Sequence, residues 1–329
     1  MDKVNNLIQP KSKLWHHIDR LAAIKAGEQP APVNVEMDLS NRCQMGCSFC
    51  AFAYTHSKGP LAKRNTHDTG DLMNTELALH IIDQLAEAGV RSITWSGGGE
   101  PTLHPDIVDI IYHADELGID QGIYTNGLKL KDDYVLTRTL KHVMRWVYLS
   151  HGPHGLDDLL AAKGDAVIGV GMMVDSRNII EIYSQASKAS KADYFHLRPI
   201  VGGLLRDSDI NTIDIIVEAL KPYEEINVIY DHDRFEMYHN WKSHGYKTCY
   251  WTQVQSVITP DGRVWACCNR RGFEDSCLGD LKEQTWNEVW ANSKAWDVDK
   301  NCRMMCRGHI PNLTLTKVME PSNKHKNFI

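Results

Sequence analysis

The feature that most constrains the fold is a regular alternation of short apolar runs and longer amphipathic stretches between residues 33 and about 220. The expected strands lie at 33–40, 90–101, 120–127, 145–150, 166–174 and 194–201. The expected helices between them lie at 74–89, 104–118, 132–142, 156–162 and 177–190. Because apolar strands that alternate with helices pair side by side in one direction, this pattern predicts a parallel sheet.

Six strand–helix units are fewer than the eight of a closed barrel. We therefore expect an α/β fold built on a partial (β/α)6 TIM-like barrel. Such folds place their chemistry at the carboxyl ends of the strands. Those ends carry Cys43–Cys50, Gly97–Pro101, Thr125–Gly127, Ser150–His151 and Arg198. We expect these segments to converge on one mouth.

The pattern changes after about residue 222. We expect a strand at 224–231, a hairpin at 254–268 around a Pro-Asp-Gly turn, and a helix at 281–296 with three core tryptophans, at 286, 290 and 296. Six of the nine cysteines lie in this part, which predicts a small cysteine-rich α+β domain. The expected domains are a lead-in at 1–30 with a helix near Lys13–Ala26, the partial barrel at 31–222, and the cysteine-rich domain at 223–329.

Composition excludes several function classes. The chain has 36 basic and 42 acidic residues, a net charge of −6, which favours neither nucleic acid nor an anionic membrane as partner. The N-terminus lacks the apolar segment of a signal peptide, and no apolar run approaches the roughly 18 residues that span a bilayer. We therefore expect a cytoplasmic protein, in which clustered cysteines bind metal or do chemistry.

Three cysteines, Cys43, Cys47 and Cys50, fall within eight residues just after the first expected strand. Thiolates are soft ligands that suit zinc or iron–sulfur clusters. A structural zinc site needs four protein ligands, and His56 is the nearest residue to complete one. The alternative is a four-iron cluster with three thiolate ligands, which leaves one iron open to a small molecule.

The run Cys-x3-Cys-x-Phe-Cys, with Phe49 as its aromatic residue, resembles the signature of the radical S-adenosylmethionine (SAM) enzymes. This resemblance implies a 4Fe-4S cluster whose open iron chelates the methionine part of SAM. In that family an electron from the cluster cleaves SAM, and the resulting 5′-deoxyadenosyl radical abstracts hydrogen from substrate. It also implies an electron donor such as flavodoxin or ferredoxin.

Four further strand ends resemble the SAM-binding elements of that family. The run Ser96–Pro101 resembles the Gly-Gly-Glu element, which implies that Gly98, Gly99 and Glu100 receive the SAM amino group. The family pattern also suggests Asn126, Ser150 and Arg198 as SAM contacts, the last through the SAM carboxylate. Each of these three has a plainer alternative as a turn residue, a cap or a surface charge. The resemblance covers about 33–200.

The second cysteine set resembles the SPASM and twitch extensions of radical SAM enzymes. Cys249, Gly262 and Cys267 match the opening spacing, and Cys302 and Cys306 supply a short closing pair. The resemblance implies that Cys249, Cys267, Cys302 and Cys306 hold one auxiliary 4Fe-4S cluster, as in the shorter twitch module. Cys268 is an alternative to Cys267, and a four-cysteine zinc ribbon is the alternative to a cluster. Cys268 and Cys277 are also candidates for hydrogen donation to a substrate radical.

We therefore expect a radical SAM enzyme acting on a small polar molecule, such as an aminocyclitol, a sugar or a nucleoside derivative. The auxiliary cluster would accept an electron during its oxidation; redox-neutral epimerisation or decarboxylation is a close variant. The main alternative substrate is a ribosomally made peptide, which the short 30-residue lead-in disfavours. The alternative from another class is a zinc-stabilised binding module.

Overall fold

The computed structural model describes residues 13–45, 47, 50, 72–200, 205–239, 243–302 and 308–320. Within these residues, seven strands pair in parallel and in chain order. They are β1 (Asn34–Asp38), β2 (Ser92–Ser96), β3 (Asp120–Thr125), β4 (Trp146–Leu149), β5 (Val167–Val174), β6 (Tyr194–Pro199) and β7 (Val228–Ile229). The predicted α/β fold with a parallel, partly closed barrel sheet is confirmed.

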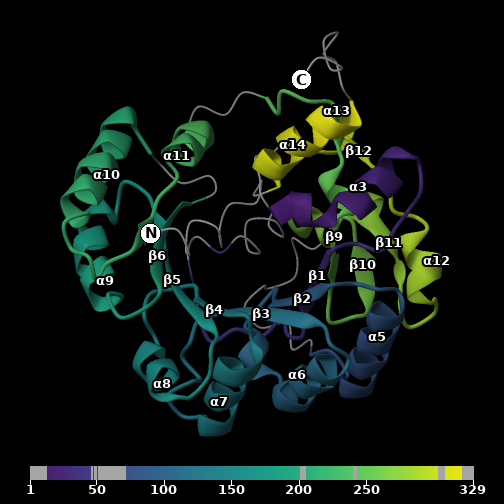
Figure 1. Cartoon of the computed structure of the whole chain (residues 1–329), viewed down its shortest axis with the longest axis horizontal. Coiled ribbons are helices and arrows are strands. Elements are labelled where there is room, and N and C mark those ends of the chain that lie inside the picture. The colour runs from purple at the N-terminus through teal and green to yellow at the C-terminus, as the bar shows by residue number, and fades with distance from the viewer. Residues whose placement is uncertain are drawn as a thin grey trace.

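Helices follow the strands and lie along the outer side of the curved sheet (Figure 1). They are α5 (Thr75–Glu87), α6 (Ile107–Glu116), α7 (Tyr134–Val143), α8 (Leu156–Ala161), α9 (Ile182–Lys188) and α10 (Asp207–Leu220). Alternate strand residues such as Met37, Trp95 and Ile123 are fully buried in the core that these helices share. The helix of the lead-in is α3 (Ile18–Lys25), preceded by a 3-10 turn at Leu14–His17.

The opposite face of the barrel strands carries large aromatic side chains. Tyr148 has its ring centroid 5.2 Å from that of Tyr124 and 6.2 Å from that of Tyr194. Glycines make room for these rings: a Cβ atom on Gly169 would lie 2.2 Å from the Tyr194 ring, and one on Gly171 would lie 2.2 Å from the Tyr148 hydroxyl. The concave side is therefore filled by aromatic groups rather than by aliphatic ones.

The C-terminal part extends the same sheet. Strand β9 (Gln255–Ile258) pairs in parallel with β1 on its outer edge. Strands β10 (Arg263–Trp265) and β11 (Cys277–Asp280) follow in antiparallel order, so the predicted hairpin completes a ten-stranded sheet. The remaining elements are β8 (Thr248–Cys249), β12 (Trp296–Asp297), α11 (His232–His239), α12 (Trp286–Trp290), α13 (Val298–Asn301) and α14 (His309–Met319). The domain boundary near residue 222 stays a prediction.

The tryptophan-rich helix is shorter than the sequence predicts. Helix α12 ends at Trp290, and Trp296 belongs to β12, where it pairs with Cys249. The Gln29 amide donates to the Trp290 carbonyl over 2.8 Å, and the Ser293 hydroxyl donates to the Thr252 carbonyl over 3.2 Å. The Trp290 carbonyl, which would accept from residue 294 in a longer helix, accepts instead from Gln29 and from the Ser293 N–H. All three tryptophans are buried, as expected.

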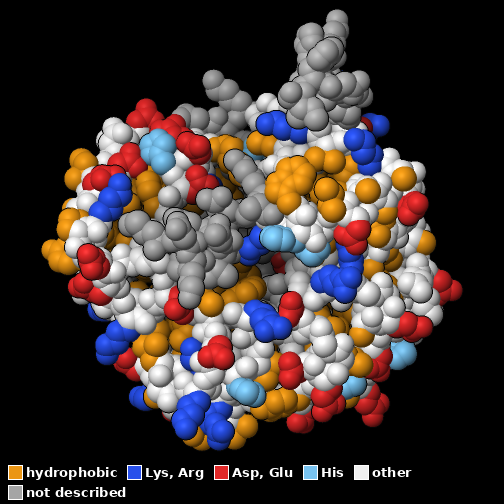
Figure 2. Space-filling model, viewed as in Figure 1, with side chains coloured by type: hydrophobic (Ala, Val, Ile, Leu, Met, Phe, Trp, Pro, Cys, Tyr) orange, Lys and Arg blue, Asp and Glu red, His pale blue; other side chains and the backbone are white. Residues whose placement is uncertain are grey.

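Over the face drawn in Figure 2, acidic and basic side chains are interspersed with apolar ones, and neither sign of charge dominates. Among the described residues, no helix is both long and apolar enough to cross a bilayer.

The cap of α5 gives a direct test of the helix that follows the cysteine loop. The Asn74 side chain accepts a hydrogen bond from the Leu77 N–H at 3.0 Å. Replacing Asn74 by Ala leaves that donor unpaired and should lower the free energy of unfolding by about 0.5–2 kcal/mol. Urea denaturation measures the change. Asn74→Asp keeps an acceptor at the helix N-terminus and should stay near the parent; an equal loss in both variants would contradict the capping role.

Candidate functional site

The three thiols of the first cluster lie just beyond the carboxyl end of β1, and all three are half-buried. The Cys50 N–H donates to the Cys47 carbonyl over 3.1 Å, and the Met45 N–H donates to Cys43 Sγ over 3.4 Å. Burial raises the pKa of Cys47 to about 11, and the neighbouring Cys50 and Cys43 thiols add to the rise. Thiols that repel one another as thiolates suit a cationic centre, because metal binding deprotonates them.

The glycine run after β2 packs against the start of this cysteine loop. The Gly99 N–H donates to the Ser40 carbonyl over 3.0 Å, and the Glu100 N–H donates to the Arg42 carbonyl over 2.7 Å. A Cβ atom on Gly98 would lie 2.2 Å from Asn41 Oδ1, and one on Gly99 would lie 2.1 Å from the Arg42 carbonyl oxygen. A larger residue at Gly99 would push the second strand end away from the backbone of the cysteine loop, whereas one at Gly98 would displace the Asn41 side chain.

Glu100 ties three segments together beneath that loop. Its carboxylate is 3% exposed and accepts hydrogen bonds from Thr102 Oγ1 at 2.7 Å, Thr125 Oγ1 at 2.6 Å and the Asn126 N–H at 2.7 Å. Burial raises the pKa of Glu100, and these donated hydrogen bonds partly oppose the rise. The side chain is fully engaged by protein donors in this structure, so its direct role here is to position the ends of β2 and β3.

Asn126 carries this network to the cysteine loop. Its Nδ2 lies 3.9 Å from Cys43 Sγ, and its Oδ1 accepts from Gln44 Nε2 at 3.4 Å and from the Leu128 N–H at 3.0 Å. The predicted residues Glu100 and Asn126 are thus brought together with Cys43.

A cavity of about 390 Å³ opens beside Cys47, between the cysteine loop and the ends of β4 and β5. Its lining residues are Met45, Cys47, His151, Gly152, Gly171, Met172, Met173, Asn178, Glu181 and Gln185. His151 Nε2 lies 3.7 Å from Cys47 Sγ, and burial lowers the pKa of His151 to about 4, so the imidazole is neutral at pH 7. The cavity combines an apolar methionine wall with amide and carboxylate groups.

Ser150 follows β4 and Arg198 lies near the end of β6, on the two sides of β5. The Ser150 N–H donates to the Thr125 carbonyl over 2.8 Å, which keeps the ends of β3 and β4 in register. The Arg198 guanidinium carbon lies 4.7 Å from the centre of the Tyr148 ring, and Arg198 pairs across the sheet with the cavity residue Met173. Its charge also helps to lower the pKa of His151.

Three of the four predicted auxiliary ligands gather near β8. Burial raises the pKa of Cys249 to about 12, and the nearby thiols of Cys267 and Cys302 contribute to this rise. A hydrogen bond from Cys268 instead lowers the pKa of Cys267 to about 7. Cys267 therefore interacts with both Cys249 and Cys268, and the choice of ligand between Cys267 and Cys268 stays a prediction.

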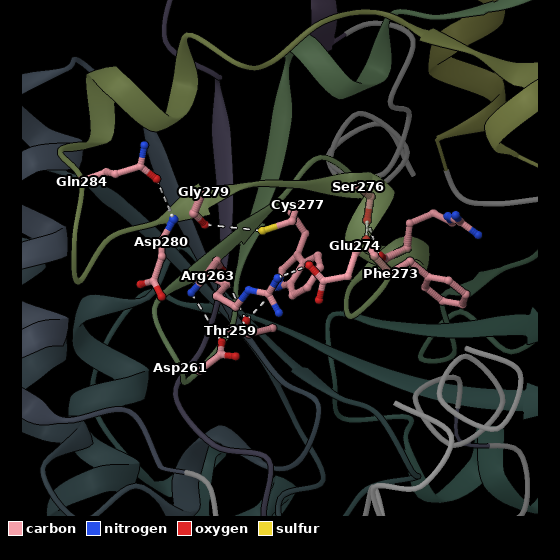
Figure 3. A network of polar contacts seen from close by, with 12 residues as sticks. Thr259, Asp261, Arg263, Phe273, Glu274, Ser276, Cys277, Gly279, Asp280 and Gln284 are labelled. Carbon is pink, nitrogen blue, oxygen red and sulfur yellow. Dashed lines mark hydrogen bonds and ion pairs between the residues drawn. The ribbon is translucent and has the colours of Figure 1, made fainter. Parts of the chain in front are cut away.

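Cys277 lies apart from these thiols, on β11. Its Sγ donates to the Gly279 carbonyl over 3.7 Å, within a hairpin network that also holds Arg263 and Glu274 (Figure 3). This places it among surface ion pairs of the hairpin.

Phe49, Cys306 and His56 lie outside the described residues. Within the described ones, no three Cys, His, Asp or Glu side chains form a compact set around a single ion. The ligand and SAM-contact assignments therefore stay predictions.

Sequence reasoning missed two groups of residues. One is the polar cavity lining, Asn178, Glu181 and Gln185, which lies at and beyond the fifth strand–helix junction. The other is His244, whose Nε2 lies 3.4 Å from Cys302 Sγ although 58 residues separate the two in sequence. A charged or amide residue just after a parallel strand is a usable signal for the first group; no local pattern marks the second.

The hydrogen bonds of Glu100 give a test of the site's scaffold. Glu100→Gln keeps the size of the side chain but replaces one acceptor oxygen by a donor group that faces N–H and O–H donors. We expect the free energy of unfolding to fall by about 1–3 kcal/mol. Urea denaturation measures this, with Glu116→Gln on the exposed end of α6 as the matched control, expected within about 0.5 kcal/mol of the parent. Equal stability of the two variants would contradict the scaffold role.

Comparisons with known proteins match two family models to this chain. The model of the radical SAM superfamily matches residues 37–165, and that of the SPASM iron-sulfur cluster-binding domain matches residues 249–308. The first covers the cysteine loop, Glu100 and Asn126; the second begins at Cys249 and includes Cys306.

Several curated proteins resemble the chain. An S-adenosylmethionine-dependent nucleotide dehydratase of Flammeovirga pacifica is 33% identical over 117 residues, which are 36% of this chain and 37% of the dehydratase. The radical SAM cyclopropyl synthase TigE of Paramaledivibacter caminithermalis is 25% identical over 340 aligned positions, covering 91% of this chain and 71% of TigE. A PqqA peptide cyclase of Methylorubrum extorquens is 32% identical over 99 residues, only 30% of this chain and 23% of the cyclase.

Two solved structures show the same fold. SuiB of Streptococcus suis, bound to its precursor peptide SuiA, has a TM-score of 0.57 at 16% identity, covering 85% of this chain and 68% of SuiB. The protein anSMEcpe with bound AdoMet has a TM-score of 0.55 at 15% identity, covering 79% of this chain and 80% of that one. The two matched domain types bind 4Fe-4S clusters, the first together with SAM. The chain therefore carries a radical SAM domain, matched over residues 37–165, and a C-terminal SPASM iron–sulfur domain, matched over residues 249–308.

Proposed function

We propose that this radical SAM enzyme binds SAM at Cys43, Cys47 and Cys50 and oxidises a substrate held in the cavity beside Cys47. The observation that carries the proposal is the position of that cavity, which meets the cysteine loop on one side and the end of β5 on the other. When bound, the cluster and SAM supply an electron and a 5′-deoxyadenosyl radical that abstracts hydrogen from substrate.

The chain's own residues have separate tasks in this proposal. Glu100 and Asn126 fix the cysteine loop on the ends of β2 and β3. Met172 and Met173 form an apolar wall that limits the access of water to the reacting atoms. Asn178, Glu181 and Gln185 offer acceptors and donors for hydroxyl or amino groups.

A volume of about 390 Å³ lies at the small-molecule end of the range for ligand pockets. This supports a small polar substrate of aminocyclitol, sugar or nucleoside type. Loss of hydrogen from such a substrate leaves an electron to be removed. We assign that task to an auxiliary cluster held by Cys249, Cys267, Cys302 and Cys306, because a cluster with four protein ligands suits electron transfer. A flavodoxin or ferredoxin is the proposed source of the initiating electron.

A peptide substrate is the second candidate, and the comparisons favour it specifically. The partial relative from Methylorubrum extorquens is a PqqA peptide cyclase, and the SuiB structure contains a precursor peptide. The partial match to a nucleotide dehydratase supports the small-molecule alternative. Epimerisation or decarboxylation without net oxidation is the remaining variant.

Removing the first set of ligands tests the two-cluster assignment. We expect Cys43→Ala, Cys47→Ala and Cys50→Ala together to lower the iron content of anaerobically reconstituted protein from about eight to about four atoms per chain. Formation of 5′-deoxyadenosine from SAM and dithionite should be lost, because no open iron remains. Iron analysis and chromatography measure both quantities.

The reciprocal triple variant, Cys249→Ala, Cys267→Ala and Cys302→Ala, is the matched control, expected to keep the first cluster and SAM cleavage. Loss of all iron in either triple variant would contradict two separate sites. A colourless zinc protein would instead support the binding-module alternative.

The substrate class is tested by its effect on SAM cleavage. A panel of aminocyclitols, sugars and nucleosides is compared with a panel of unstructured peptides, each at saturating SAM and reductant. We expect at least one small polar compound to raise 5′-deoxyadenosine formation about tenfold or more over the unstimulated rate, because bound substrate consumes the radical and pulls the reaction forward. Stimulation by peptides alone would establish the second candidate in its place.

A further inference from the structure

A buried ion network joins the C-terminal part of the chain to β1. The Arg271 guanidinium is 2% exposed and contacts both acids of β1, Glu36 at 1% and Asp38 at 0%. Arg271 Nη2 lies 3.3 Å from Glu36 Oε2, and Nη1 donates to Asp38 Oδ2. Gln255 on β9 donates from Nε2 to Glu36 Oε1 over 2.6 Å. Three ionisable groups, two on β1 and one 233 residues after Asp38, thus share one buried site.

The same guanidinium reaches the segment that bears the second cysteine set. Arg271 Nε donates to the Cys268 carbonyl over 3.0 Å. Arg271 follows Cys267 by four residues, and its positive charge is one of the influences that stabilise the Cys267 thiolate. Arg271 therefore contacts two segments. One is β1, which leads into the first cysteine loop, and the other is the backbone next to Cys267, a predicted ligand of the auxiliary cluster.

Stability alone does not explain this arrangement. Burying three charged groups carries a large desolvation cost, and well-packed apolar residues of similar size often serve stability equally well. Two carboxyl groups face one guanidinium; burial raises the pKa of Asp38, and the Arg271 charge partly opposes that rise. A guanidinium that donates hydrogen bonds to three partners does, however, fix the relative positions of those partners closely, because each hydrogen bond has its own direction.

We propose that Arg271 is a positioning residue for the auxiliary cluster: it holds the Cys267–Cys268 segment against β1, and its charge makes that cluster easier to reduce. The inference rests on the proposed ligand set above. A cluster gains one negative charge on reduction, and a nearby cation stabilises the reduced form, which raises the reduction potential. The acids of β1 act in the opposite sense, because they offset part of the guanidinium charge.

The experiment isolates the auxiliary cluster in the full chain by carrying Cys43→Ala, Cys47→Ala and Cys50→Ala. Its reduction potential is then measured by redox titration followed by electron paramagnetic resonance. Arg271→Met should shift the potential to a more negative value, and Glu36→Gln should shift it to a more positive one. Shifts of opposite sign indicate an effect of charge on the reduction potential. A general loosening of the structure would instead shift the potential of both variants in the same direction.

Two further variants complete the design. Arg270→Met removes the neighbouring guanidinium, and its shift should be smaller because the paired Asp275 carboxylate offsets that charge. Arg271→Lys keeps the charge without the fork; the potential should stay near the parent, while amide hydrogen exchange of 264–270 becomes faster.

The outcomes separate the inference from the function on which it rests. If the background variant binds no iron, the proposed ligand set fails. If the cluster is present and Arg271→Met shifts the potential no more than Arg270→Met, the inference is overturned. Where Arg271→Met does not fold, Glu36→Gln decides: a positive shift supports the role of the network, and an unchanged potential overturns it.

Discussion

Parallel pairing of consecutive strands is the constraint on which the rest of the structure depends. Because β1 to β6 run in one direction and in chain order, every strand–helix junction falls at the same edge of the sheet. Hydrogen bonds then join the segments that follow β1, β2, β3 and β4, so residues scattered over more than 100 positions of sequence lie close together. The buried carboxylate of Glu100 shows the result, since it joins the ends of β2 and β3 beneath the cysteine loop.

The two faces of the barrel strands carry different kinds of side chain. The outer face packs aliphatic side chains such as Met37 and Ile123 against the helices, which provides the apolar core. The inner face carries aromatic rings, the Arg198 guanidinium and the β1 acids, which stack on or form ion pairs with one another. The hairpin of the matched SPASM domain is added to the edge of this same sheet, so β1 has a neighbouring strand on both sides.

Much of the fold follows from local pattern, and less of the site does. Hydrophobic periodicity indicates the strands and helices of the barrel, and cysteine spacing indicates both cysteine sets. The short α12 was not predictable in this way, because the carbonyl at its end is bound by Gln29, which is 261 residues away in sequence. Arg271 and His244 were missed for the same reason: their roles arise from partners more than 50 residues away. A signal for Arg271 did exist, since two acids at alternate positions of a buried strand require a cationic partner.

The pairing of β1 with β9 also has a consequence for biosynthesis. Residues 34–37 pair with β2 on one side, but on the other side they pair with residues 255–258, some 220 positions later. At about 5–20 residues per second, the ribosome takes roughly 10–45 seconds to supply that partner. During this interval the outer edge of β1 has no strand to pair with, and such an edge is a template for wrong association. Before Arg271 is synthesised, Glu36 and Asp38 lack the partner that they have in the folded chain. Acidic side chains on this strand disfavour pairing with an apolar strand of another chain.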